Sequence, residues 1–477
     1  MDYMEEFAQY DAVGLAELIR SKEVTPLELV DEVIDRIERV NPTLNGVTIK
    51  MYDHARELAQ GDIGNGPLAG VPFLLKDFLA EYAGVEYSAS SRFLQGFVPD
   101  RDTELVKRFK AGGFITVAKT NLPEFAIGAT TEPRMTGATH NPWDTSRTPG
   151  GSSGGAGAMV ASGVVPVAHG NDAGGSIRIP AAACGTVGLK PTRGRNPLGP
   201  YFGEVFSGFV AEHVLTRTVR DTAAVLDITA GPDVGDWYPA PPQSASYLDE
   251  AGTPPGRLRI AFSAESPTGT EVHPDCANAV RDVAALCEEL GHDVEERSPD
   301  HDTHGLWLDW TTMMSAGVAW GVHGWEERIG RKVEPGEIEP FIAALVERGD
   351  AVGAPAYLAH LERLQLGARE IGKFFTEHDI WLTPTLGEPP LPLGILTYDS
   401  GDPFELRRRQ ATFSPFTYIA NVTGQPGISL SLAWNGDNLP IGIHFLGRYG
   451  DEATLLRLSG QLEEAQPWAD RRPPVWA

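Results

Sequence analysis

The chain has 477 residues, 42% of them hydrophobic and 22% charged, so it can build a large core and is not disordered as a whole. Its 65 acidic residues outnumber its 39 basic ones, which gives a formal net charge of −26 at pH 7. A surface this negative repels phosphate backbones and anionic lipid heads. We therefore expect neither nucleic acid nor a membrane among its partners.

The segment MDYMEEFAQYDAVGLAELIRS at the start is acidic and lacks the basic and apolar stretches of a signal peptide. The sequence contains no run of about 18 apolar residues, the length that crosses a bilayer. Its three cysteines, Cys184, Cys276 and Cys287, are odd in number and scattered, which is typical of a reducing compartment without a disulfide framework. A cytoplasmic location is the expectation.

Residues 12–40 carry a helical pattern, because their apolar residues recur at helical spacing. Thr25, Pro26 and Glu28 supply a cap, a proline at the first helical position and an acidic first turn. From about residue 66 the pattern changes to short apolar runs bounded by glycine.

Three such runs are GVPFLLKD (70–77), FITVAKTN (114–121) and VVPVAHGND (164–172), with a helical stretch at 102–111. Strand–helix–strand alternation of this kind predicts an α/β fold with a largely buried sheet.

Similar elements are expected in the second half of the chain. The sequence predicts strands at 258–264, 380–385, 427–434 and 441–448, an amphipathic helix at 274–290 and a helical stretch at 304–375. That last stretch carries a stripe of large side chains, Trp307, Trp310, Met313, Met314, Trp320 and Trp325, which is more typical of core than of a pocket.

Residues 231–256 are rich in Pro, Gly and Ser and could be a linker between domains. They also contain Trp237, Tyr238 and Tyr247, which are costly to leave in solvent. We therefore expect an ordered surface excursion here.

Two glycine-rich turns stand out, GGSSGG (150–155) and DAGGS (172–176), and each presents a serine. Glycine lets backbone amides approach a substrate closely, so the two turns could converge on one point. A flexible linker is one alternative, although apolar residues lie between the turns. Phosphate binding is a second, although the spacing fits neither common phosphate-binding motif. A third alternative reads 150–154 as a nucleophile elbow, which requires a preceding strand and a later Asp and His.

The segment resembles the signature of the amidase signature family, in which GGSSGG is followed, 24 residues after its first serine, by the serine of D-x-G-G-S-I-R. The match extends to GVPFLLKD, AKTNLPEFAIGATTEP, GATHNPWDTSRTPGGSSGG, CGTVGLKPTRGR, NVTGQPGISLSL and LPIGIHFLGR, in this order along nearly the whole chain. The resemblance implies one amidase domain over 1–477, with one long mixed sheet covered by helices on both faces. It also implies a signature core at about 66–230 and a helical, substrate-facing excursion at about 300–375.

Carried over by position, Ser176 matches the family's nucleophile, Ser152 its bridging serine and Lys76 its base. The chemistry agrees, because a serine hydroxyl attacks a carbonyl only after losing its proton, and a buried neutral lysine can accept that proton. The alternative for Lys76 is an ion pair with Asp77 or another carboxylate. The resemblance further implies a cis peptide bond between Gly151 and Ser152.

The resemblance places the oxyanion-binding amides at Ala173, Gly174, Gly175 and Ser176. Asp172 and Arg178 are expected to support this turn. Phe125 matches a position whose main chain approaches the substrate. The twelve histidines show no metal-binding spacing, and neither a metal nor a cofactor is expected.

Within the family, AHGNDAGGSIRIPA and GLKPTRGR resemble bacterial cyclic-amide (nylon-oligomer) hydrolases most. The expected substrate is a small or oligomeric amide. Cleavage of carbamates or aryl acylamides by the same triad is an alternative. A glutamyl-tRNA amidotransferase subunit fits less well, because Ile179 stands where that subgroup commonly has glutamine. A catalytically inactive binding protein would be expected to have lost a triad residue, and none is lost. A homodimer remains an option.

Overall fold

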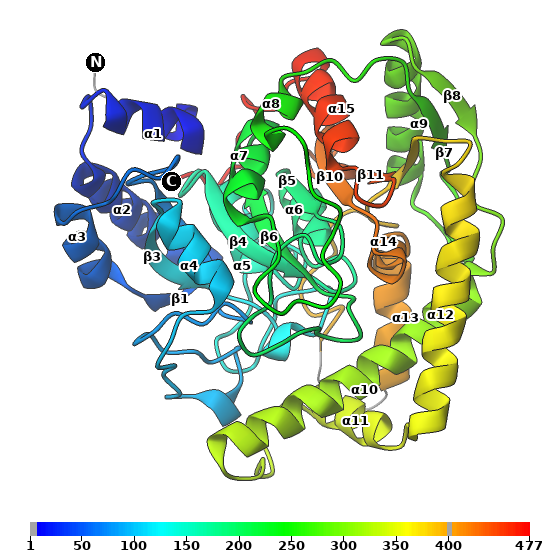
Figure 1. The fold of residues 1–477 in the computed structure, drawn as a ribbon, viewed down its shortest axis with the longest axis horizontal. Coiled ribbons are helices and arrows are strands. Elements are labelled where there is room, and N and C mark those ends of the chain that lie inside the picture. Colours follow the sequence, from blue (N-terminus) through cyan, green and yellow to red (C-terminus); the bar gives the residue numbers. More distant parts are fainter. Residues whose placement is uncertain (1–6, 398–402) are drawn as a thin grey trace.

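The computed structural model describes residues 7–397 and 403–477. Eleven strands form one mixed sheet in the order β1-β3-β2-β4-β6-β5-β10-β11-β9-β7-β8 (Figure 1). The strands are β1 (Val47–Lys50), β2 (Pro72–Lys76), β3 (Ile115–Thr120), β4 (Val167–Asp172), β5 (Val187–Lys190), β6 (Ala211–Thr216), β7 (Arg259–Phe262), β8 (Asp293–Glu296), β9 (Ile380–Pro384), β10 (Gly427–Trp434) and β11 (Pro440–Gly447). Each of the seven predicted strands is confirmed.

The helices are α1 (Ala12–Arg20), α2 (Pro26–Leu44), α3 (Tyr52–Gln60), α4 (Glu104–Ala111), α5 (Gly154–Ala161), α6 (Arg178–Cys184), α7 (Val219–Thr229), α8 (Tyr247–Ala251), α9 (Pro274–Glu289), α10 (Thr303–Ile329), α11 (Pro340–Asp350), α12 (Ala354–Phe374), α13 (Pro403–Phe413), α14 (Tyr418–Thr423) and α15 (Glu452–Ala465). Short 3-10 turns cover Phe7–Gln9, Arg92–Leu94 and Glu124–Ala126. The expected cap of α2 is confirmed, because Thr25 and Glu28 form a reciprocal capping box.

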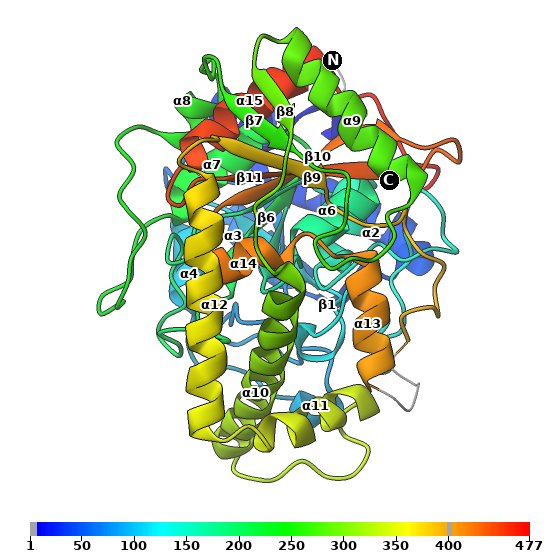
Figure 2. The same ribbon diagram turned by 90° about the vertical axis from the view of Figure 1, so that its right-hand side faces the viewer.

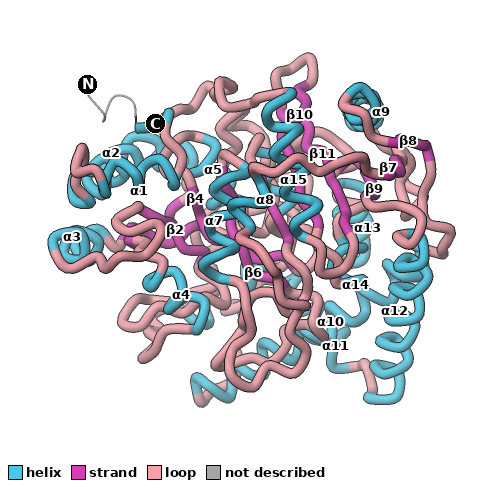
Figure 3. Tube along the Cα trace, turned by 45° about the horizontal axis from the view of Figure 1, so that its top comes forward, coloured by secondary structure: helices cyan, strands magenta, loops and turns pink. Residues whose placement is uncertain are grey.

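Both faces of the sheet are buried under helices, as expected. Successive residues of a strand point to opposite faces. In β9, Ile380 and Leu382 belong to one hydrophobic cluster and Trp381, which lies between them, belongs to another. The first cluster is closed by α7, α9 and α15, and Figure 3 shows α7, α8 and α15 lying over the sheet. The second is closed by α6, α10 and α14.

The stretch 304–375 folds into α10, α11 and α12, which extend away from the sheet (Figure 2). No helix in the described ranges is long and apolar enough to cross a membrane.

The excursion at 231–256 is ordered, as expected. The expectation that its aromatic side chains avoid solvent is wrong for two of them. Trp237 is 81% exposed and Tyr238 is 72% exposed. Their rings contact each other edge-on at 6.2 Å instead of entering the core. Tyr247 alone is buried, and it begins α8.

Candidate active site

The sheet brings the lysine and one glycine-rich turn together. Lys76 is the last residue of β2, and Asn171 and Asp172 end β4. The two strands are parallel neighbours, with Leu74 opposite Ala168, so their carboxyl ends lie at the same edge. The carboxyl ends of strands are the usual place for a ligand in α/β folds.

The segment 150–153 leads into α5, and the Gly151–Ser152 peptide bond is cis, as the resemblance implies. A Cβ atom on Gly151 would lie 2.3 Å from the carbonyl oxygen of Thr130, so only glycine fits there. The nucleophile-elbow alternative is wrong, because residues 141–153 contain no strand. The backbone N–H of Ser153 donates to the carbonyl oxygen of Ser176 at 3.2 Å, which ties the two turns together.

The ammonium nitrogen of Lys76 is fully buried among polar acceptors. Its Nζ atom lies 2.7 Å from Oγ of Ser152 and 2.9 Å from Oγ of Ser153. A third contact of 2.7 Å reaches Oδ1 of Asn171. Burial lowers the pKa of Lys76 to about 7, although the negative charges of Glu212 and Asp172 act in the opposite direction. The side chain therefore exchanges a proton near neutral pH.

These contacts determine which hydroxyl faces the lone pair once Lys76 is neutral. A neutral amine has two N–H donors and one lone pair. Oδ1 of Asn171 can only accept a hydrogen bond. The Ser153 hydroxyl donates to the carbonyl oxygen of Asn171 at 3.4 Å, so it accepts from Lys76. Ser152 is the hydroxyl that remains to donate its proton to the amine. Sequence reasoning missed both Asn171 and Ser153.

The alternative of an ion pair between Lys76 and Asp77 is wrong. Asp77 pairs instead with Lys119 at 3.0 Å, and both side chains are fully buried. The same carboxylate accepts hydrogen bonds from the Ser88 N–H and hydroxyl and from the Ala89 N–H. Lys76 forms no salt bridge with any residue in the described part of the chain.

Ser176 is partly exposed and lines a cavity of about 70 Å³. We expected Ser152 to bond to both Lys76 and Ser176. The contact with Lys76 is present, whereas no hydrogen bond joins Ser152 to Ser176, two residues that the structure describes in full.

The turn at 172–176 is held by a buried charged network. Asp172 accepts two hydrogen bonds of 2.9 Å from Arg178 and one of 2.8 Å from the side-chain amide of Asn421. Burial alone would raise the pKa of Asp172, but Arg178 and Asn421 hold it well below its usual value. Asn421 also accepts from Arg178 at 2.8 Å, and it is a supporting residue that sequence reasoning missed.

The expected oxyanion donors need one correction. The N–H of Gly175 donates to Oδ1 of Asp172 at 2.8 Å, so it is not available to a substrate oxygen. Ala173, Gly174 and Ser176 line the cavity, whereas Gly175 does not. We therefore assign Gly175 to the support of the turn.

The approach of the Phe125 main chain to the substrate stays a prediction. The N–H of Phe125 donates to the carbonyl oxygen of Ala89 at 2.9 Å, and the residue lines a neighbouring cavity. The next four residues, 126–129, line the cavity at Ser176.

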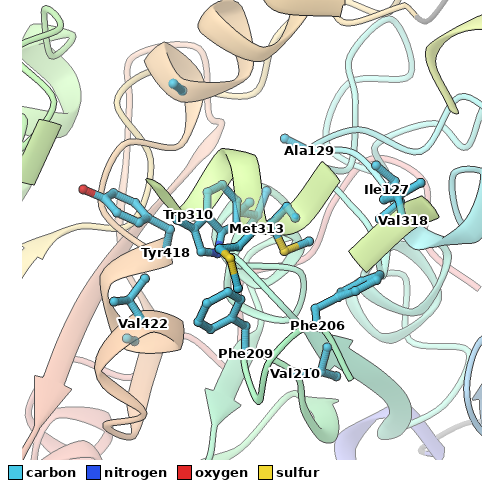
Figure 4. Close-up of a cluster of buried hydrophobic side chains, with 14 of the residues drawn as sticks. Ile127, Ala129, Phe206, Phe209, Val210, Trp310, Met313, Val318, Tyr418 and Val422 are labelled. Carbon is cyan, nitrogen blue, oxygen red and sulfur yellow. The ribbon is translucent and has the colours of Figure 1, made fainter. Parts of the chain in front are cut away.

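The large side chains of α10 are both core and cavity wall. Trp307, Trp310 and Met314 are buried within one hydrophobic cluster, yet they line the cavity at Ser176. Figure 4 shows Trp310 of this cluster beside Met313 and Tyr418. Gln410 of α13 lines the same cavity, and its Nε2 atom is buried without a hydrogen-bond partner in the described structure. It is a further candidate contact that sequence reasoning missed.

Two buried histidines lie close to Lys76 and to Arg178, and neither contacts Ser152 or Ser176 through a hydrogen bond in the described structure. Nδ1 of His169 accepts the backbone N–H of Lys76 at 3.3 Å, and its Nε2 contacts Glu212 at 2.5 Å. His444 lies 3.0 Å from Arg178, and burial lowers its pKa well below the usual value. Within residues 7–397 and 403–477, no group of three or more His, Cys, Asp or Glu side chains could hold a metal ion.

Known proteins resemble this chain over nearly its whole length. The profile of the amidase family matches residues 28–456. The chain belongs to the amidase family. It is a hydrolase that acts on the carbon–nitrogen bond of amides.

Among relatives of this amidase, the 6-aminohexanoate-cyclic-dimer hydrolase of Paenarthrobacter ureafaciens is 38% identical over 98% of this chain and 96% of its own. A solved structure of 6-aminohexanoate cyclic dimer hydrolase complexed with substrate superposes with a TM-score of 0.93 at 37% identity, over 98% of this chain and 100% of the other. A bacterial aryl acylamidase of the amidase signature family gives a TM-score of 0.87 at 26% identity, over 96% and 97% of the two chains.

Proposed function

We propose that this amidase cleaves its substrate through an acyl-enzyme on Ser176, with Ser152 as proton relay and Lys76 as general base. The observation that carries the proposal is the contact of 2.7 Å between Ser152 and a lysine that is fully buried and has a pKa of about 7. Lys190 is also fully buried with a pKa of about 7, but its Nζ donates to the carbonyl oxygen of Pro191, so the contact with the Ser152 hydroxyl is what distinguishes Lys76.

In the acylation step, neutral Lys76 accepts the proton of Ser152, which accepts the proton of Ser176. The Oγ atom of Ser176 forms a bond to the carbonyl carbon of the amide, and the carbonyl π electrons move to its oxygen. When the carbon–nitrogen bond breaks, the leaving nitrogen receives the proton back through Ser152. Water then attacks the ester by the same relay and releases the acid.

The negative charge on the carbonyl oxygen needs donors that are already in place. We assign this role to the backbone amides of Ala173, Gly174 and Ser176, whose residues line the cavity. The network of Asp172, Arg178 and Asn421 holds their turn in position.

The relay also needs a contact between Ser152 and Ser176, which are not hydrogen-bonded to each other here. We infer that rotation of the Ser176 side chain about its Cα–Cβ bond makes this contact when substrate binds. Catalytic hydrogen bonds often tighten only in the complex with substrate.

For the substrate, we propose a small or oligomeric carboxylic amide. Similarity to the cyclic-dimer hydrolase over 98% of the chain supports this class. Aryl acylamides are a second candidate substrate class, because the chain also resembles an aryl acylamidase. Carbamates are a further candidate class, because their carbonyl group reacts in the same way. An amidotransferase role beside tRNA is less well supported, given the net charge of −26. A cytoplasmic location fits the three cysteines, which are all free and buried.

The test is a panel of linear amides, cyclic amides, anilides and carbamates offered to the purified enzyme and to Ser176→Ala. The proposal requires that the wild type cleave at least one amide and that Ser176→Ala cleave it several orders of magnitude more slowly. Equal rates for the two proteins would refute it.

A further inference from the structure

A second cavity, of about 230 Å³, adjoins the cavity at Ser176. The two share a wall, because Ile127 lines both. In Figure 4, Ile127, Phe206 and Val318 gather on one side of the buried cluster that also contains Trp310. Arg328 is a charged residue of its wall, and nearly all other side chains of the wall are aromatic or aliphatic.

One face of α10 forms a floor under both cavities. Trp307, Trp310 and Met314 line the cavity at Ser176, whereas Val318, Val322 and Trp325 line the second one. The spacing between these positions is three or four residues throughout, which is the spacing of a single helix face. With a rise of about 1.5 Å per residue, Met314 to Trp325 spans about 16 Å. The two cavities therefore follow each other along the helix axis.

Gly321 is partly exposed and Gly324 is exposed, and both glycines lie along the second cavity. Gly321 and Gly324 lie inside the 27-residue helix α10 and line this cavity. A Cβ atom on either glycine would meet no heavy atom within 4 Å, so no close packing requires glycine there. Glycine in a helix interior is also less favourable than alanine. Neither packing nor helix propensity therefore accounts for glycine at these two positions.

The ends of the cavity suit an apolar guest. At the rim, Trp320 is 49% exposed and its ring meets Phe202 edge-on at 5.7 Å. Arg328, which also lines the cavity, forms an ion pair with Glu81, and its guanidinium lies 4.2 Å from the ring centre of Tyr201. Among the described residues of the wall, Arg328 is the one cation and it is already paired with Glu81, which leaves burial of apolar surface as the main source of affinity.

We propose that this cavity is a subsite for an extended apolar arm, alkyl or aryl, of the amide substrate. The proposal rests on the assignment of Ser176 as nucleophile, because it places the scissile bond beside Ser176 and the arm over Gly321. The arm belongs either to the acyl part or to the amine part of the substrate, and two series of compounds distinguish them.

The first experiment measures kcat/KM for straight-chain N-methyl amides of increasing acyl length and for N-alkyl acetamides of increasing amine length. In one series kcat/KM should rise about two- to fourfold per added methylene over several methylenes. In Gly321→Leu, which fills the space over α10, the ratio of long-chain to short-chain kcat/KM should fall at least tenfold. Gly372→Leu is the matched control, because Gly372 is an exposed glycine of α12 with the same open surroundings. It should keep the wild-type ratio.

A flat response in both series, from an enzyme that cleaves short amides, overturns the subsite and leaves the proposed function intact. A wild-type length response in folded Gly321→Leu overturns it as well. Cleavage that persists in Ser176→Ala would instead refute the proposed function.

A binding measurement on Ser176→Ala makes the test independent of turnover. Calorimetry should show N-methyloctanamide, or N-octylacetamide, binding at least 100-fold more tightly than N-methylacetamide. Equal affinities for all three compounds would overturn the proposal.

Discussion

The Nζ atom of Lys76 and the Oγ atom of Ser152 lie 2.7 Å apart, and both side chains are fully buried. Asn171 and Ser153 occupy the other two hydrogen-bonding directions of the amine. Since both act as acceptors, the lone pair of neutral Lys76 is directed to Ser152. This geometry supports the proposed role of Lys76 as base, with the Ser152 hydroxyl as its proton donor.

The first prediction concerns pH. Only the neutral amine of Lys76 accepts a proton, and its pKa is lowered by burial to about 7. We expect kcat/KM to rise about tenfold per pH unit below pH 7 and to level off above it. A pH profile measured from pH 5 to pH 9 with a stable amide substrate checks this. Activity that is constant across that range would contradict it.

Asn171→Asp should move that profile. The substitution places a carboxylate where an amide oxygen now lies 2.7 Å from Nζ of Lys76. A negative charge at this distance stabilises the ammonium form and raises the pKa of Lys76. At pH 7 the rate should fall at least tenfold and recover as the pH is raised by one to three units. Asn278→Asp, the same change on the exposed surface of α9, is the control and should keep the wild-type profile.

Asn421→Ala should weaken both the turn and the fold. The amide of Asn421 donates to the backbone and side chain of Asp172 and to the carbonyl oxygen of Phe209. Its loss leaves buried polar groups without partners, so the free energy of unfolding should fall by about 1–3 kcal/mol or more. We also expect kcat to fall, because the proposed oxyanion donors belong to this turn. Urea denaturation and steady-state kinetics measure the two effects, and wild-type values for both would show that Asn421 is dispensable.

Histidine replacement separates this mechanism from a histidine-based one. Substituting each of the twelve histidines in turn should leave the rate within about tenfold, since none is assigned a chemical role. Lys76→Ala should be nearly inactive while its circular dichroism spectrum stays that of the wild type. The lysine assignment fails if one folded histidine variant loses as much activity as Ser176→Ala.

Features that depend on neighbouring residues could be predicted from the sequence. The start of α2 follows from the local chemistry of Thr25, Pro26 and Glu28, and β2 and β4 follow from short apolar runs between glycines. The family and the overall α/β fold followed from motifs in a fixed order. These predictions needed no knowledge of which segments meet in space.

Features that depend on distant contacts could not be predicted in this way. Asn421 hydrogen-bonds to Asp172, which lies 249 positions earlier in the sequence. No local pattern in the sequence distinguishes this asparagine from an asparagine on the surface. Trp237 was expected to avoid solvent, because sequence alone does not show whether the surrounding loop has a core to enter. In the sequence, Gly321 is a residue that disfavours helix at the middle of a helical stretch. Its position along the second cavity is known only from the structure.

Covalent labelling of the nucleophile tests the central claim most directly. The purified enzyme is treated with a fluorophosphonate, and the modified residue is located by mass spectrometry of its peptides. We expect one adduct on Ser176, formed much more slowly in Lys76→Ala and absent in Ser176→Ala. An adduct on Ser152 or Ser153 in the wild-type enzyme would contradict the account, because it would make a residue of the 150–155 turn the nucleophile.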